Sequence, residues 1–340
     1  MRILATHNKK DHPAWRQRVE LLEDWEAASR KNWRVRRSAL RRLCEDLRWA
    51  WRLFRASRRY DVLLTGSERP ALMLALMQKV ARGNARVPHV LLECMWNLPE
   101  KGFGRWKRRL LLRWVAASTD RIIVYARHQI DDYAKILDVS KDKFSFVHSH
   151  STLYEATYPA TDGDYIFSGG YTNRDYPTLF EAVRGLPYRT VVCVGSRQSL
   201  GKDVPANVEV RENLSEDAFN RLIAASAFIV VPLKGDVLEA GGRQVFQNAM
   251  TMSKAVVVTD LSATDYITHG LTGLLVTPGN PVDLRDAIVT LMCNRTIAVN
   301  LGREAQRVSA DFTPERFFEQ LFAIIEEVVL ERSGLVPVSG

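Results

Sequence analysis

The sequence predicts an α/β protein built from two Rossmann-like domains, each a parallel sheet with helices on both faces. The chain has 340 residues, more than one hydrophobic core usually serves, so two domains are expected. Short runs rich in β-branched residues alternate with helical patterns, and this alternation predicts parallel strands joined by helices. A stretch rich in Pro, Gly, Thr and Asp, residues 154–164, interrupts the alternation and is predicted to be the linker.

Strand-like runs occur on both sides of this linker. Five precede it, at residues 2–6, 61–65, 89–93, 121–125 and 143–147, and six follow it, beginning at Tyr165, Arg189, Asn207, Ala227, Ala255 and Gly273. Helices are predicted at roughly 175–185, 215–225, 242–253 and 281–294. The expected domains are residues 1–155 and 163–312, followed by a terminal helix over residues 313–332 that has Thr313 as N-cap and a proline in its first turn.

Charge divides the chain into two parts. The formal net charge is +9, but residues 1–150 carry 32 Lys and Arg against 16 Asp and Glu, net +16, and the remainder carries 16 against 23, net −7. All eight tryptophans also lie in the first part: Trp15, Trp25, Trp33, Trp49, Trp51, Trp96, Trp106 and Trp114. A cationic, aromatic surface suits either a nucleic acid or an anionic membrane.

Other bulk features narrow the class. No apolar run approaches the roughly 18 to 20 residues of a membrane-spanning helix, and the start MRILATHNKK lacks the apolar core of a signal peptide. Four cysteines lie far apart without C-x-x-C spacing, which favours neither disulfides nor a zinc site. A cytoplasmic protein is expected.

Two glycines and an arginine open the helix predicted near residue 242. Gly241 and Gly242 allow backbone amides to approach a ligand, and a helix N-terminus favours negative charge. Arg243 adds a fork-shaped donor, and Arg174, which follows Gly169 and Gly170, supplies a second cation. Either these residues only form turns, or they bind an anion such as a diphosphate.

Several motifs in this half resemble those of a known family. The block FIVVPLKGDVLEAGGRQVFQNAMTMSKAVVVTDLSATDYITHGLTGLLVTPGNPVDLRDAI, residues 228–288, and the stretch FSGGYTNRDYPTLFEAV, residues 167–183, resemble the donor half of the family-4 ("group 1") glycosyltransferases. Thirteen residues of the first block match the family's motifs: Ala249, Met250, Lys254, Val256, Val257, Thr259, Gly270, Thr272, Gly273, Leu275, Val276, Pro278 and Gly279. The resemblance covers about 150 residues and implies the GT-B fold, in which two such domains face each other across a cleft.

The resemblance implies a transferase that uses a nucleotide-diphosphate sugar, retains anomeric configuration and needs neither metal nor cofactor. It also implies that the terminal helix crosses back to the first domain. The expected donor-binding residues are Gly169, Gly170, Arg174, Glu239, Gly241, Gly242, Arg243, Gln244 and Asn248.

The chain departs from the family at three positions. The family's two glutamates, eight residues apart, align with Ala240 and Asn248, and the nearest acid to the first is Glu239. Glu239 is expected to contact the donor sugar, and Asn248 to hydrogen-bond a ribose diol. The family's first arginine aligns with Gly170, so Arg174 alone matches its basic pair.

Acceptor-side candidates lie at the predicted strand ends of the first domain, where α/β sheets place ligands. Glu93 is either a general base or a strand-end charge, and His148 with His150 lacks a third ligand for a metal. The expected catalytic residues are Glu239, Arg174 and Glu93, and the acceptor-side candidates are Ser67, Trp96, Arg127 and His150.

Two arginine-rich helices are predicted in the first domain. Between Trp33 and Arg59 the apolar stripe of Leu40, Leu43, Leu47, Trp51 and Phe54 is expected to pack in the core. In GFGRWKRRLLLRWVAAS, from Gly102, tryptophans alternate with cations as in a helix lying in a bilayer interface, although buried packing suits the tryptophans equally. The membrane-contact candidates are Arg105, Trp106, Arg108, Arg109 and Trp114.

The favoured function is transfer of a sugar to a lipid-linked or membrane-proximal saccharide, by a protein peripheral to the inner face of the membrane. A GT-B sugar epimerase is one alternative. A degenerate, non-catalytic GT-B module that binds membrane or nucleic acid is the other. No nucleic-acid partner is expected, because basicity is the sole feature that supports one.

Overall fold

The structure is a computed structural model with two compact units. They comprise Met1–Val147 with Phe318–Gly340, and His148–Phe317. It describes residues 1–6, 13–21, 39–66, 69–82, 86–92, 94, 96, 98, 102–153, 158–196, 200, 203–235, 238, 241–261 and 265–335.

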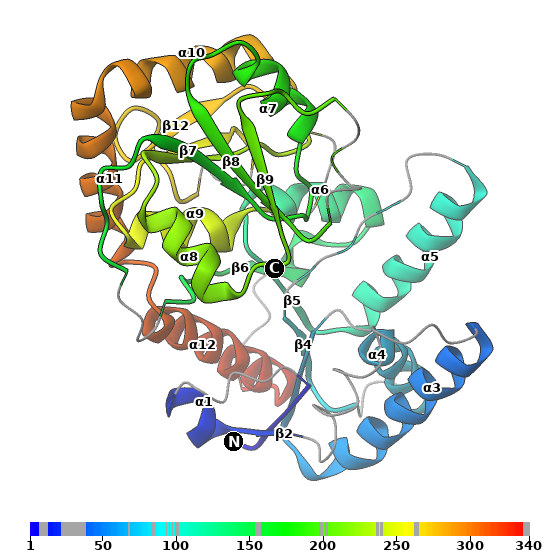
Figure 1. Cartoon of the computed structure of the whole chain (residues 1–340). Helices are drawn as coiled ribbons and strands as arrows, with labels where there is room; N and C mark the ends of the chain where they lie inside the picture. The colour runs from blue at the N-terminus through cyan, green and yellow to red at the C-terminus, as the bar shows by residue number, and fades with distance from the viewer. Residues whose placement is uncertain are drawn as a thin grey trace. The chain divides into compact units, whose positions relative to one another are not determined.

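The first unit contains a six-stranded parallel sheet in the order β2-β1-β3-β4-β5-β6 (Figure 1). Its strands are β1 (Ile3–Ala5), β2 (Val19–Leu21), β3 (Val62–Thr65), β4 (His89–Leu91), β5 (Arg121–Val124) and β6 (Phe144–Phe146). Its described helices before the terminal one are α1 (Pro13–Arg18), α3 (Ala39–Ala56), α4 (Arg69–Arg82), α5 (Phe103–Ser118) and α6 (His128–Leu137). Strand β2 was not predicted, because Val-Glu-Leu is too short to show an alternating pattern.

The second unit contains six parallel strands in the order β12-β11-β10-β7-β8-β9. They are β7 (Tyr165–Gly169), β8 (Arg189–Val194), β9 (Val208–Glu212), β10 (Phe228–Val231), β11 (Val256–Thr259) and β12 (Leu274–Val276), all at predicted positions. Helices α7 (Tyr176–Val183), α8 (Glu216–Ala224), α9 (Arg243–Thr251) and α10 (Pro281–Cys293) lie where the sequence predicted them, and α11 (Arg295–Ser309) is additional. The predicted fold class, two doubly wound parallel sheets, is confirmed.

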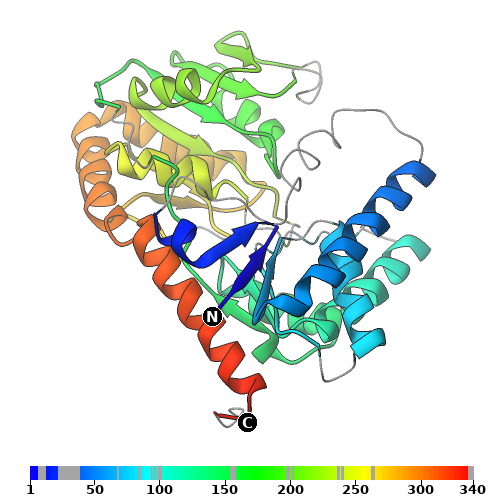
Figure 2. The same ribbon diagram turned by 90° about the horizontal axis from the view of Figure 1, so that it is seen from below.

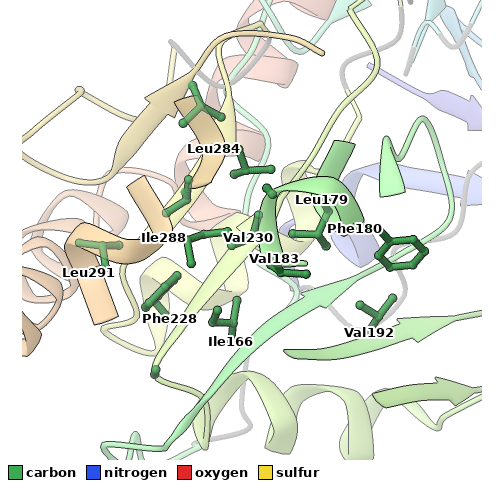
Figure 3. Packing of buried hydrophobic residues seen from close by; sticks show 14 of the residues in the cluster. Ile166, Leu179, Phe180, Val183, Val192, Phe228, Val230, Leu284, Ile288 and Leu291 are labelled. Atoms are coloured by element: carbon green, nitrogen blue, oxygen red, sulfur yellow. The ribbon is translucent and has the colours of Figure 1, made fainter. Parts of the chain in front are cut away.

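Alternate residues of the second sheet fill two different cores. Ile166, Val192, Phe228 and Val230 point to the face covered by α7 and α10, whose Leu179, Phe180, Leu284 and Ile288 meet them in Figure 3. Their neighbours in sequence, including Phe167, Val191, Ile229 and Val231, pack instead with Phe246, Ala249 and Met250 of α9. Both faces are therefore apolar, which is why the strands read as continuous valine and isoleucine runs.

The terminal helix α12 (Pro314–Arg332) enters the first unit at Phe318. The rings of Trp15 and Phe318 lie 5.8 Å apart, and Arg121 Nη2 lies 2.9 Å from a carboxylate oxygen of Glu331. Leu321 and Val328, two apolar residues of this helix, are fully buried. Figure 2 shows the helix, in orange to red, next to the blue N-terminal part of the first unit, where Arg18 Nη1 lies 3.3 Å from a carboxylate oxygen of Glu326.

Helix α3 corrects one expectation from the sequence. Leu40, Leu43, Leu47 and Trp51 were predicted to pack in the core, but they are 71%, 39%, 47% and 52% exposed. Of the predicted stripe only Phe54 is buried, at 7% exposed, and it is joined in the core by Ala50 and Leu53, which are fully buried. Apolar spacing predicts an amphipathic helix but does not say which of two adjacent stripes meets the core.

Candidate functional site

The second sheet reverses its strand order at β7. The chain continues from β7 to β8 and β9 on one side, and β10 to β12 lie on the other, so β7 and β10 flank a topological switch point. The loops that follow these two strands are joined: Asp175 N donates to Pro232 O at 3.0 Å, and Lys234 N donates to Asn173 O at 3.1 Å. Ligands of open α/β sheets bind at this position, outside the carboxyl ends of the strands.

Arg174 lies inside these joined loops. Its side chain is 7% exposed, and its Nε and Nη1 donate to the carbonyl oxygens of Gly169 and Thr172 at 2.9 and 2.8 Å. Burial lowers the pKa of the guanidinium from its ordinary value. Within the described ranges no carboxylate forms an ion pair with Arg174, and no hydrogen bond uses Nη2. A buried cation of this kind is stabilised by an anion, because an uncompensated buried charge is costly.

Two of the predicted glycines are required by the geometry. Gly242 is the N-cap of α9 with φ +80°, and an added Cβ would lie 2.7 Å from Val231 Cγ1. Gly170 has φ +102°, and its Cβ would lie 2.5 Å from Arg174 Nη2. The N-cap residue Gly242 makes no side-chain cap hydrogen bond, and the N-terminus of a helix favours a negatively charged ligand. Arg174 thus lies between a bare helix N-terminus and Gly170.

A cavity of about 420 Å³ opens beside Gly170. It lies at the carboxyl ends of β7, β8 and β9, between the start of α8 and one side of α9, and its volume is within the usual range for small-molecule sites. Burial raises the pKa of the Cys193 thiol in its wall to about 12, so the thiol is protonated at neutral pH. The described lining residues are Gly170, Tyr171, Cys193, Val194, Gly195, Asn213, Leu214, Glu216, Phe219, Asn220, Gln244, Val245 and Asn248.

Asn248 lines this cavity but uses its amide to hold a loop. Its Oδ1 accepts from Ser151 Oγ at 2.9 Å and from Thr152 N at 3.0 Å. Its Nδ2 donates to Thr152 Oγ1 at 3.1 Å, and the residue is 3% exposed. Gln244, exposed on the same helix, donates to Thr152 Oγ1 at 3.2 Å. Asn248 therefore binds the loop that begins the second unit, and its Nδ2 also donates to Asn220 Oδ1 of α8 at 3.4 Å.

The remaining donor-side candidates lie around the same point. Gly169 ends β7, where an added Cβ would lie 2.4 Å from the Phe219 ring. Gly241 is buried against Asn173, and Arg243 is half-buried at the first position of α9. Glu239 lies outside the described residues, as do Glu93 and Ser67 of the first unit.

The described acceptor-side candidates differ in their burial and in the unit to which they belong. Trp96 is 2% exposed and packs edge-on against Tyr133, with ring centroids 6.2 Å apart, so it is a core residue. Arg127 is exposed, with its guanidinium 4.5 Å from the centre of the Phe146 ring. His150 belongs to the second unit, where it is 7% exposed and lies against Phe317 at a ring distance of 4.8 Å. Trp96 and Arg127 thus belong to the first unit and His150 to the second.

The candidate membrane helix α5 is exposed on its aromatic face. Trp106 and Trp114 are 57% and 59% exposed, and Phe103 is 68% exposed. Arg108 and Arg109 are exposed beside them, and Arg105 is half-buried. Helices α3 and α5 both pack against α4, on one side of the first unit (Figures 1 and 2). Among the described residues, no helix has the length and apolarity needed to cross a membrane.

The sequence analysis named three of the thirteen described lining residues of the cavity, Gly170, Gln244 and Asn248. Asn213, Leu214, Glu216, Phe219 and Asn220 were not singled out, although they follow β9, a strand that the sequence located. The rule that parallel sheets bind ligands at the carboxyl ends of their strands predicts this segment.

Solved structures share this architecture. Sucrose-phosphate synthase of Thermosynechococcus elongatus matches with a TM-score of 0.66 and 17% identity, over 83% of this chain and 77% of its own. HepE of Anabaena, in complex with UDP and glucose, matches with a TM-score of 0.72 and 14% identity, over 96% of this chain and 100% of its own. The chain has the GT-B fold.

Sequence comparison gives the same indication. Residues 164–294, all within the second unit, match the model for "Glycosyl transferases group 1". An uncharacterized glycosyltransferase of Methanocaldococcus jannaschii is 24% identical over 239 residues, which are 65% of this chain and 64% of the relative. The match thus spans a little under two thirds of the relative's length. The predicted resemblance is confirmed.

Proposed function

We propose that this protein transfers a sugar from a nucleoside-diphosphate sugar that binds in the cavity of the second unit. The observation that carries the proposal is Arg174, a buried guanidinium without a carboxylate partner among the described residues, beside the cavity and the bare N-terminus of α9. A diphosphate supplies the missing negative charge. The neighbouring apolar cavity has room for the nucleoside.

The same groups suit the reaction. When the bond between the sugar and the diphosphate breaks, negative charge develops on the leaving oxygen. Arg174 Nη2, the Arg243 side chain and the first-turn amides of α9 are fixed donors that stabilise this charge without reorganising. We therefore propose transfer without a metal ion and, from the family, with retention of anomeric configuration.

The first unit is proposed to bind the acceptor, a lipid-linked or membrane-proximal saccharide. Its support is a surface that we call the α3–α5 surface, defined by Leu40, Leu43, Leu47, Trp51, Phe103, Trp106 and Trp114. Exposed cations of the same two helices surround these side chains, including Arg41, Arg48, Lys107, Arg108 and Arg109. Aromatic side chains among cations fit the headgroup region of an anionic bilayer. The protein would then be peripheral on the inner face of the membrane.

The experiment that tests the transferase proposal is release of nucleoside diphosphate from a panel of nucleotide sugars, with a membrane lipid extract as acceptor. One sugar donor should turn over, at an unchanged rate in excess EDTA. Arg174→Ala should abolish turnover, and Arg285→Ala, which removes a guanidinium bound to Ala182 O and Arg184 O elsewhere in the unit, should not. Turnover that EDTA stops would contradict the metal-free mechanism. Equal turnover in the Arg174 variant would contradict the site.

A further inference from the structure

The described lining of the cavity contains a single carboxylate, Glu216. It is exposed at the first position of α8, and no described residue forms a hydrogen bond or ion pair with it. The cap of this helix is supplied by Ser215, whose Oγ accepts from Ala218 N at 3.2 Å. Glu216 is therefore available to a ligand.

The order of the strands places Glu216 relative to the diphosphate. Arg174 and the N-terminus of α9 lie at β7 and β10, whereas Glu216 follows β9. Two strand spacings of about 4.8 Å separate β7 from β9, so this end of the cavity lies on the order of 10 Å from the diphosphate position. A nucleoside diphosphate that spans the cavity puts its ribose over β8 and its base beside Glu216.

Two further groups surround the same end. Asn213 lies in the left-handed region, with φ +52°, and its backbone N donates to Val194 O at 3.1 Å. Its side chain has no described hydrogen-bond partner, so its amide can donate to a ligand. Leu214 and Phe219 provide apolar contact for the flat faces of a base.

We propose, building on the proposed nucleotide-sugar function, that the donor is a guanine nucleotide sugar and that Glu216 selects the base. Guanine presents an acceptor, O6, beside two adjacent donors, N1–H and the N2 amino group. The Asn213 amide matches the acceptor, and the Glu216 carboxylate accepts from both donors. Charge-assisted pairs of this kind are stronger than neutral ones.

The other bases match this end of the cavity less well. Uracil and thymine present O2 and O4 on either side of one N–H, so a carboxylate that meets this edge faces at least one oxygen lone pair. Adenine and cytosine have one amino group beside an acceptor nitrogen. None of them offers two adjacent donors to one carboxylate.

The test measures dissociation constants of the full chain for GDP, IDP, UDP and ADP by calorimetry. IDP is the matched ligand, because it differs from GDP only in lacking the N2 amino group. GDP should bind at least about tenfold more tightly than each of the others, since a site that hydrogen-bonds a donor rejects the analogue without it. Glu216→Gln should weaken GDP binding about 10- to 100-fold and reduce the difference between the dissociation constants for GDP and IDP. The dissociation constant for UDP should change less than about twofold.

Glu181→Gln is the control variant, since it removes an exposed carboxylate of α7 from outside the cavity lining. It should leave all four constants unchanged. Tightest binding of UDP or ADP, or equal binding of GDP and IDP by the unaltered protein, would overturn the guanine assignment and leave the transferase proposal standing. Absence of binding by every nucleotide would overturn both. The ligand comparison decides the question even if Glu216→Gln fails to fold.

Discussion

At the residue scale, Asn248 shows how one side chain can replace a family glutamate and take another task. Its amide joins α9 to Ser151 and Thr152 through hydrogen bonds of 2.9 to 3.1 Å. A glutamate lacks the amide donor that Thr152 Oγ1 accepts from. The substitution therefore exchanges a carboxylate for a group that both donates and accepts.

Asn248→Ala should lower the free energy of unfolding of the second unit by about 1 to 3 kcal/mol, because it leaves buried donors of Ser151 and Thr152 without acceptors. Chemical denaturation measures this change. Asn300→Ala, on the exposed side of α11, is the matched control and should change stability by less than about 0.5 kcal/mol. Equal effects in the two variants would show that the loop does not depend on Asn248.

His89 gives the first unit a pH dependence. Its imidazole is fully buried, its Nε2 lies 2.7 Å from Thr65 Oγ1, and burial lowers its pKa from 6.5 to about 4. The unfolded chain therefore binds a proton between pH 6.5 and 4 that the folded unit does not. The stability from this residue is complete above pH 6.5 and is lost as the pH falls towards 4.

His89→Gln should remove this dependence. The stability difference between the unaltered protein and the variant should shrink on acidification from pH 6.5 to 4 by up to about 3 kcal/mol, since one pKa unit corresponds to about 1.4 kcal/mol. Denaturation curves recorded across this pH range give the slope of the free energy of unfolding against pH. His128→Gln, which removes a partly exposed imidazole of α6, should keep the slope of the unaltered protein. Parallel curves for His89→Gln and the unaltered protein would contradict the assignment.

At the element scale, the entry into α9 is shaped by backbone geometry. Gly242 has a left-handed conformation and lies in close contact with Val231 of β10. It also lies beside Arg174, because a Cβ added at Gly242 would be 3.6 Å from Arg174 Nη1. Ser, Asn or Asp at an N-cap would stabilise the helix further. Any of them would clash with Val231 and occupy the space in front of the amides.

Gly242→Ala should therefore weaken both folding and nucleotide binding. Gly270→Ala is the matched control, because Gly270 also has positive φ, +75°, but has no atom within 4 Å of an added Cβ. Both substitutions should lower the free energy of unfolding by about 1 to 2 kcal/mol, because alanine is disfavoured in the left-handed region. Gly242→Ala should lower it further and should also weaken nucleotide binding at least about tenfold. Thermal unfolding and calorimetry measure the two losses. Nucleotide affinity that is unchanged in Gly242→Ala would exclude the α9 N-terminus as the diphosphate site.

At the scale of the whole molecule, charge and exposed apolar surface coincide in the first unit. Binding to anionic vesicles should be strong at low salt and fall steeply with ionic strength, because each cation near the surface contributes about 1 kcal/mol and is screened within a Debye length. Replacing Trp106, Trp114, Arg108 and Arg109 with alanine should weaken binding to anionic vesicles. It should also reduce the blue shift of tryptophan fluorescence that vesicle addition causes. Trp51→Ala, on the exposed face of α3, should add to the loss.

The control for this experiment replaces Arg303 and Arg307 of α11, exposed cations of the second unit, and should leave vesicle binding unchanged. Nucleotide affinity should stay within a few tenths of a kcal/mol in all these variants, since distant sites are usually independent. Poor binding to both neutral and anionic vesicles, together with tight binding of single-stranded RNA, would contradict the membrane proposal.

The sequence by itself determined the fold class, the positions of β7 to β12 and the glycine-containing loops around Gly170 and Gly242. These features follow from local patterns, because strand and helix periods, glycines and charges are read over a few neighbouring residues. Tertiary structure alone decided that Arg174 is buried, that Trp96 lies in the core and that α3 exposes Leu40, Leu43, Leu47 and Trp51. It also brought Asn213 and Glu216 to the same cavity as Gln244. Burial and proximity depend on which elements pack together, and residues about 30 positions apart become neighbours only when the sheet forms.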